Sequence, residues 1–221
     1  MKTRLAIFLT VLAIGAGLAF WQVGFIPSAV AGDALVVTTA VATLPTGAEE
    51  HEYVGNKKCK MCHKKEYDSW KETKKAHTFE PLRPGEASEA KQKANLDPAK
   101  DYTKDESCLA CHATGFGKPG GYSVPDPADE KAVKKAKKLE GVGCEGCHGP
   151  GNNYVKLHKE IKKSKRTYTD EEMYAAGLKK IEASVCTPCH NEKSPTYVPF
   201  NYEEQKDKGL HEIFPLKQRE E

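Results

Sequence analysis

One short pattern of cysteine and histidine occurs four times in the chain and accounts for every cysteine present. The pattern is Cys-x-x-Cys-His, and its copies are numbered motifs 1 to 4 in chain order: Cys59, Cys62 and His63; Cys108, Cys111 and His112; Cys144, Cys147 and His148; Cys186, Cys189 and His190. Two thiols at this spacing can each form a thioether to a haem vinyl group, and the imidazole that follows then lies under the iron. The pattern therefore predicts four covalently attached haem c groups, each with a proximal histidine.

Disulfides and structural zinc are the competing interpretations of paired cysteines. Neither requires a histidine after every second cysteine, and histidine makes up only 8 of the 221 residues. Zinc would also need pairs of motifs to converge, whereas the four motifs are dispersed along the chain. We therefore favour haem attachment.

The remaining histidines are candidates for the second axial position on the irons. They are His51, His77, His158 and His211. The last three adjoin segments expected to be helical, at 63–75, 157–165 and 203–211. His51 lies in an acidic segment, where a solvated histidine is the simpler interpretation. Met173 is the one thioether candidate outside the motifs and the N-terminal segment, so the ligand inventory favours low-potential, bis-histidine haems. Spacing does not assign the distal histidines to particular haems.

The elements that position these groups are expected to be short helices and loops. Hydrophobic residues make up 38% of the chain and charged residues 29%, which is too polar for a large aliphatic core. Four haems would supply the missing apolar surface. We expect a mainly α fold with long loops and little β structure, in which the haems form the core. Thr169 and Glu172 match a capping box that opens a helix at 170–183.

The N-terminal segment has the features of an export signal. Lys2 and Arg4 precede an apolar run, and the small residues Ala29 and Ala31 match a cleavage site. The run is also long enough to be an uncleaved membrane anchor. We expect residues 1–31 to be a cleaved signal peptide, leaving no stable membrane span and placing the protein in the periplasm or outside the cell. With 34 Lys and Arg against 31 Asp and Glu, the chain lacks the basic excess of a nucleic-acid binder.

The segments around motifs 1 to 3 resemble the tetrahaem cytochrome c-554 family. They read EYDSWK (66–71), AKQKANLDPAKDYT (90–103), GFG (115–117), GGY (120–122), GVGC (141–144) and CHGPG (147–151). The resemblance implies haems stacked in pairs, with His77, His158 and His211 as distal ligands. It also implies an open distal face on the iron of His112, shielded by Phe200, and electrons received from a multihaem hydroxylamine oxidoreductase.

The chain departs from that family ahead of Gly55. Residues 32–54 are expected to be an N-terminal extension, and 55–221 the tetrahaem domain. The extension holds an apolar, β-branched stretch at 34–44 that predicts a strand without a partner, followed by His51.

Three interpretations stay open, and all share electron transfer through four haems. In the first, strand 34–44 docks on another copy of the chain and His51 ligates that copy's haem, giving a conductive extracellular filament. In the second, the protein is a monomeric periplasmic shuttle with one five-coordinate haem, and its partners are redox proteins. In the third, that haem reduces a nitrogen oxide, although no catalytic constellation is recognisable. We expect an electron carrier rather than an enzyme, delivering electrons to redox proteins or to an extracellular acceptor.

Overall fold

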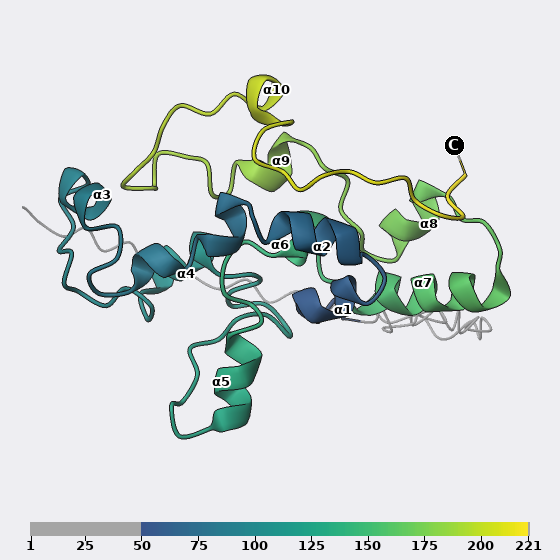
Figure 1. Ribbon diagram of the computed structural model, residues 1–221, viewed down its shortest axis with the longest axis horizontal. Coiled ribbons are helices and arrows are strands. Elements are labelled where there is room, and N and C mark those ends of the chain that lie inside the picture. The colour runs from purple at the N-terminus through teal and green to yellow at the C-terminus, as the bar shows by residue number, and fades with distance from the viewer. Residues whose placement is uncertain (1–49, 221) are drawn as a thin grey trace, which may run out of the picture. The chain divides into compact units, whose positions relative to one another are not determined.

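The computed structural model describes residues 50–220, which form short helices joined by long loops (Figure 1). The expected signal peptide, the apolar stretch 34–44 and most of the expected extension lie outside the described residues. Within the described part, β structure is limited to isolated bridges, from Ala113 to Glu140 and Gly141 and from Tyr168 to Arg219. The predicted fold class, mainly helical with little β structure, is confirmed.

The described residues contain α-helices and two 3₁₀ helices. In chain order they are α1 (Asn56–Lys60), α2 (Lys64–Trp70), η1 (Lys74–His77), η2 (Glu80–Leu82), α3 (Ser88–Lys93), α4 (Glu106–His112), α5 (Glu130–Ala136), α6 (Cys144–His148), α7 (Asn152–Ser164), α8 (Asp170–Ala175), α9 (Ala183–Cys186) and α10 (Tyr202–Gln205).

Each Cys-x-x-Cys-His motif lies on one helical turn. Motif 2 ends α4 and motif 3 forms α6, whereas motifs 1 and 4 continue from α1 and α9 into a turn. In motif 1 the backbone N–H of His63 donates to the carbonyl of Cys59 at 2.9 Å. In motif 4 the N–H of His190 donates to the carbonyl of Cys186 at 3.0 Å. Residues at this spacing are neighbours on a helical turn, so the first thiol and the imidazole share one side of it.

The helix predicted at 170–183 begins as expected but ends early. Its capping box is confirmed, because the Thr169 side chain accepts from the Glu172 N–H and the Glu172 side chain accepts from the Thr169 N–H. The helix α8 then stops at Ala175. Gly177 follows with φ at +100°, a conformation that favours glycine and ends a helix.

The other predicted helices also differ in extent. The helix predicted at 63–75 is divided into α2 and η1, and the one predicted at 157–165 begins earlier, at Asn152 of α7. The prediction for 203–211 was wrong, since α10 ends at Gln205 and Gly209 adopts a φ of +62°. His211 therefore lies in a non-helical segment, which crosses the molecule toward α8 (Figure 1).

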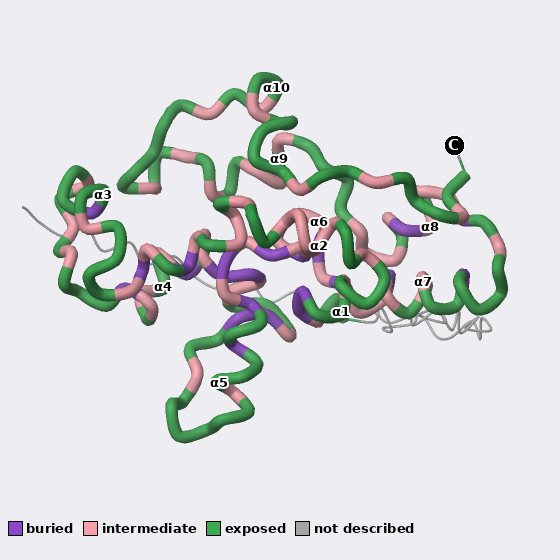
Figure 2. Tube along the Cα trace, viewed as in Figure 1, coloured by how far each residue is buried: buried purple, intermediate pink, exposed green. Residues whose placement is uncertain are grey.

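Few segments of the chain are buried (Figure 2), and the buried hydrophobic residues form two small clusters. The first comprises Phe79, Leu82, Tyr102, Leu109, Ala113, Tyr122, Ala136 and Leu139. The second comprises Tyr154, Ile161, Tyr168 and Met173. Met173 is 1% exposed inside the second cluster. None of the four motif imidazoles belongs to either cluster, so the motifs surround space that aliphatic side chains leave unfilled. Among residues 50–220, no helix combines the length and apolarity needed to cross a bilayer.

Candidate haem-binding site

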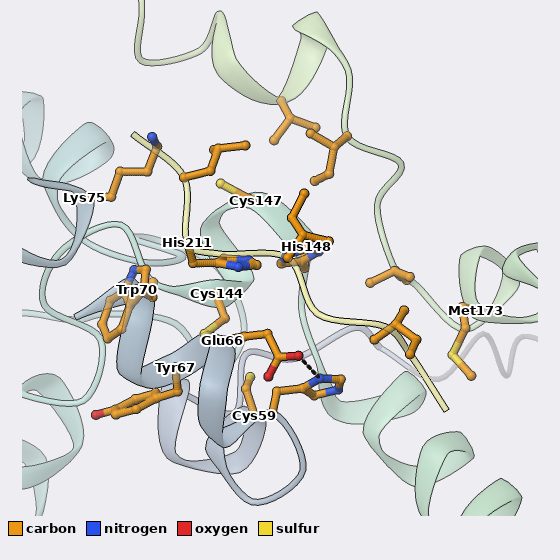
Figure 3. A pocket seen from close by; sticks show the side chains of 18 of the residues that line it. Cys59, Glu66, Tyr67, Trp70, Lys75, Cys144, Cys147, His148, Met173 and His211 are labelled. Carbon is orange, nitrogen blue, oxygen red and sulfur yellow. Dashed lines mark ion pairs between the residues drawn. The ribbon is translucent and has the colours of Figure 1, made fainter. Parts of the chain in front are cut away.

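A large cavity brings motifs 1, 3 and 4 together (Figure 3). Its volume is about 1660 Å³, and His63, His148 and His190 all line it. Typical small-molecule pockets hold roughly 300–1,000 Å³. The cavity therefore has room for more than one large planar group.

Exposed apolar side chains line this cavity. They are Met61, Ile181, Val198, Leu210, Ile213 and Leu216. Ile213 is 83% exposed and Val198 is 73% exposed. Leaving such groups in water forgoes about 1.5–3 kcal/mol for each large aliphatic side chain. The lining thus suits the apolar faces of a macrocycle.

The rings of His63 and His158 face each other across part of this cavity. Their centroids are 5.9 Å apart and their planes are tilted by 40°. Two imidazoles that bind one metal from opposite sides, each nitrogen about 2 Å from it, hold their ring centres about 6 Å apart. The separation therefore fits one iron between His63 of motif 1 and His158 of α7.

A second facing pair joins His148 of motif 3 to His211. Their ring centroids are 6.2 Å apart, with an interplanar angle of 36°, and both rings project into the cavity in Figure 3. Burial, together with His211 and His63 nearby, lowers the pKa of His148 to about 4. Its imidazole is therefore neutral at neutral pH, which is the form that binds a metal.

Two of the candidate ligands are oriented by backbone carbonyls. Nδ1 of His211 is bonded to the carbonyl of Glu212 at 2.7 Å, and Nδ1 of His112 to the carbonyl of Thr78. A bond of this kind fixes the ring and leaves Nε2 for a metal. The chemistry and spacing of these side chains therefore fit haem.

Motif 4 has an aromatic ring, not an imidazole, against its histidine. The Phe200 ring stacks on His190 with centroids 4.5 Å apart and planes 22° from parallel. Phe200 also lines the large cavity. The resemblance implied that Phe200 shields His112, but here it contacts the histidine of motif 4.

His77 and His112 line a separate hollow of about 440 Å³. Nδ1 of His77 is bonded to the Glu80 carboxylate at 2.8 Å, and Nε2 to the Lys71 carbonyl at 2.8 Å. Both ring nitrogens are thus engaged, and among the described residues no ring contact joins His77 to another histidine. Ligation by His77 stays a prediction, and it requires the ring to release these bonds.

His51 lies outside both cavities. Its Nδ1 is 3.4 Å from Nδ2 of Asn153, and a Cβ added to Gly177 would lie 2.6 Å from the same Nδ1. The flanking backbone is held by Asn152, which donates to the Glu50 carbonyl and accepts from the Glu52 N–H. The structure therefore does not bring His51 to any of the four motifs.

Thiols of different motifs also meet. The thiols of Cys59 and Cys144 lie close enough to affect each other's pKa, as do those of Cys111 and Cys189. Motif 1 is thus adjacent to motif 3, and motif 2 to motif 4. The pKa of the Cys147 thiol is raised mainly by burial, and the nearby Cys186 thiol raises it further. Motif 3 is therefore also near motif 4.

Cys-x-x-Cys-His turns around an apolar cavity, with facing imidazole pairs, are the features of a c-type cytochrome. Residues 58–149 match the family model described as cytochrome c554 and c-prime. Cytochrome c-554 of Nitrosomonas europaea is 39% identical over 183 residues, covering 76% of this chain and 74% of that protein.

A solved structure, the reduced state of cytochrome c554 from the same organism, matches with a TM-score of 0.63 and 36% identity, covering 78% of this chain and 91% of the other. The chain therefore belongs to the cytochrome c-554 family. It is a c-type cytochrome that carries electrons on covalently bound haem c.

Two residues of the site were not anticipated from the sequence. Lys75 lines the cavity and donates from Nζ to the Gly209 carbonyl at 2.7 Å, holding the segment that carries His211. Glu145, inside motif 3, is 1% exposed. A lysine in a Lys-rich stretch and a glutamate between two cysteines both suggest surface positions, so sequence alone carried no signal for them.

Proposed function

We propose that this chain is an exported tetrahaem cytochrome that passes electrons along four haems in the order 1–3–4–2, numbered by motif. The observation that carries the proposal is the two pairs of facing imidazoles, His63 with His158 and His148 with His211, each at the separation that one iron requires. The eight cysteines, two in each motif, would attach the four haems.

The roles of the side chains follow from their chemistry. Haem iron, once bound, supplies one-electron exchange between its ferric and ferrous forms. The paired imidazoles would hold the iron and keep its potential low, since both ligands would be nitrogen rather than thioether. Apolar groups such as Leu210 and Ile213 exclude water from the macrocycle faces. Met173 is buried in the second cluster and also lines the cavity, and we assign the axial positions to histidines because these face each other in pairs.

The proposed order rests on which thiols are adjacent. Cys59 and Cys144 link motifs 1 and 3, Cys147 and Cys186 link motifs 3 and 4, and Cys111 links motif 2 to motif 4 through Cys189. Haems attached to neighbouring thiols lie close together, and this proximity favours electron hopping. The haems of motifs 1 and 2 would then be the two ends of the electron-transfer path.

Two measurements on the purified holoprotein test the proposal. Haem content per chain should be four, and the ferric electron paramagnetic resonance spectrum should contain low-spin signals from at least the two bis-histidine haems. A haem content below four would overturn the tetrahaem assignment. Loss of all low-spin signals would overturn the ligand pairs.

Assembly into a filament is the second candidate function, and the position of His51 favours it. The side chain is exposed and outside the cavities of its own chain, so it is available to a haem of another copy. The filament interpretation predicts that His51→Ala yields monomers or opens one haem. Normal fibres from that variant would contradict it.

The monomeric shuttle makes the opposite prediction. His51→Ala would then leave the spin states and electron-transfer rates unchanged, and the wild type would already contain one high-spin haem. Reduction of a nitrogen oxide at that haem would show as substrate-dependent turnover of the reduced protein. In either case a periplasmic or cell-surface location follows from the expected signal peptide at 1–31, and the partners would be redox proteins or an extracellular acceptor.

A further inference from the structure

A carboxylate is buried inside motif 3, at the first of the two positions between its cysteines. Glu145 is 1% exposed, although glutamate is almost never fully buried without partners. The corresponding residues of motifs 1 and 4, Lys60 and Thr187, are exposed, and that of motif 2, Leu109, is apolar. Neither haem attachment nor iron ligation uses the Glu145 side chain.

Three backbone N–H groups surround the carboxylate. Val54 donates to Oε1 at 2.8 Å and Gly151 to the same oxygen at 2.7 Å, while Gly55 donates to Oε2 at 2.7 Å. Every one of these partners is a donor. A protonated carboxyl would also need an acceptor for its own hydrogen, whereas an ionised one is satisfied by donors alone. The surroundings are therefore those of an anion.

Two opposing effects act on the ionisation of Glu145. Burial is the larger one and raises its pKa, while the three backbone N–H groups lower it in part. The ionised form is therefore assigned from the three donors and not from the direction of the pKa shift. The negative charge also reaches the neighbouring motif. The pKa of the Cys59 thiol is raised by its hydrogen bond with Cys144, by burial and by the charge of Glu145. The field of Glu145 thus extends over attachment points of both motif 1 and motif 3.

We propose that Glu145 is a fixed negative charge that lowers the reduction potentials of the two haems held by motifs 1 and 3. This inference rests on the proposed function. Reduction adds one electron from the reductant to a ferric haem and, with Glu145 ionised in both states, transfers no proton. The added electron is repelled by a nearby buried anion, because charges interact strongly where water is excluded. The ferric form is stabilised accordingly.

The carboxylate has a second effect, which the test must separate from the first. By binding the N–H groups of Val54 and Gly55 it holds residues 54–55 against motif 3. Glu145→Gln removes the charge and replaces one acceptor with an amide donor. Glu145→Asp keeps the charge but is one methylene shorter, so it cannot reach all three donors. Both variants therefore weaken the hydrogen bonds that hold residues 54–55, but only Glu145→Gln removes the negative charge.

The experiment is a spectroelectrochemical titration of the holoprotein, with haem content and thermal stability measured on the same samples. In Glu145→Gln, two of the four midpoints should rise and the other two should stay in place. Glu145→Asp should melt at a lower temperature yet keep wild-type midpoints. The control is Glu203→Gln, at an exposed residue of α10, which should change neither the midpoint potentials nor the melting temperature.

Unchanged midpoints in a folded Glu145→Gln protein with four haems would overturn the inference while leaving the tetrahaem proposal intact. A shift of all four midpoints together would overturn it as well. If Glu145→Gln does not fold, the test rests on Glu145→Asp. A rise in the midpoint potentials of that variant, which keeps the charge, would show that the hydrogen bonds of Glu145 and not its charge set the potentials, and would overturn the inference. A haem content below four would instead contradict the proposed function.

Discussion

The imidazoles of His148 and His211 face each other with centroids 6.2 Å apart, although one belongs to motif 3 and the other to a segment that follows motif 4. That segment is held near the cavity by Lys75, which donates to the Gly209 carbonyl, and by Ser69, whose hydroxyl oxygen accepts from the Glu212 N–H. The proposed axial ligand His211 is thus positioned by contacts of its segment with η1 and α2 rather than by a helix of its own.

Removing either distal histidine should open one iron. We expect His211→Ala and His158→Ala each to replace one low-spin ferric signal with a high-spin signal, because the imidazole is lost and alanine cannot ligate. Glu192→Ala, at an exposed residue that lines neither cavity, is the control. Electron paramagnetic resonance at low temperature measures the change. An unaltered spectrum in His211→Ala would show that His148 has another partner.

Loosening the segment that carries His211 should expose it to proteases. Lys75→Met removes the bond to the Gly209 carbonyl, and local opening of a surface segment governs how fast it is cleaved. We expect cleavage within residues 206–213 to be several-fold faster, measured by limited proteolysis and mass spectrometry. Lys74→Met alters an exposed neighbour and should leave the rate unchanged. Equal rates in the two variants would contradict a role for Lys75.

The motifs and the candidate axial histidines could be identified from the sequence, but the pairing of the histidines could not. Thiol and imidazole spacing within a motif is local, whereas His63 meets His158, and His148 meets His211, through tertiary packing. The prediction of a helix that ends at His211 was wrong for a local reason, because the backbone at Gly209 adopts a positive φ. Glu145 was missed because its burial depends on N–H groups of Val54 and Gly55, which lie far away in the chain.

Acid should weaken the helix that carries motif 2. Asp105 caps α4, accepting from the Ser107 N–H at 3.1 Å and its hydroxyl at 2.6 Å, and the Ser107 side-chain bond is the first cause of its lowered pKa. A lowered carboxyl pKa gives stability that is complete above the unfolded value of about 3.9 and is lost as pH falls through the folded value.

The variant Asp105→Asn separates capping from titration. Asparagine caps about as well as aspartate but does not ionise, so the variant should stay within about 0.5 kcal/mol of wild type at pH 7. Its free energy of unfolding should then fall less between pH 4 and pH 2. Guanidinium titrations followed by circular dichroism at each pH measure this, with Asp207→Asn as a control outside the helices. Parallel acid profiles for wild type and Asp105→Asn would contradict the assignment.

The first apolar cluster should depend strongly on Leu109. Its side chain is 0% exposed within motif 2 and packs in that cluster. Leu109→Ala should cost about 2–5 kcal/mol in unfolding free energy, the range for leucine truncation in a packed core. Val124→Ala, at a side chain that is 41% exposed, should change it by less than about 0.5 kcal/mol. A loss below 1 kcal/mol in Leu109→Ala, judged from denaturant midpoints, would mean that the haems rather than this cluster stabilise α4.

The adjacency of thiols from different motifs also bears on how the protein is made. The thiol of Cys59 lies close to that of Cys144, and the thiol of Cys111 close to that of Cys189. A chain that folds before its haems are attached therefore presents cysteines that can oxidise to each other. In an oxidising compartment such crossed disulfides would tie up half of the attachment points. Maturation must therefore keep these cysteines reduced until each forms its thioether with a haem vinyl group. The proximity of the motifs, which favours electron transfer, thus requires that haem attachment precede oxidation of the thiols.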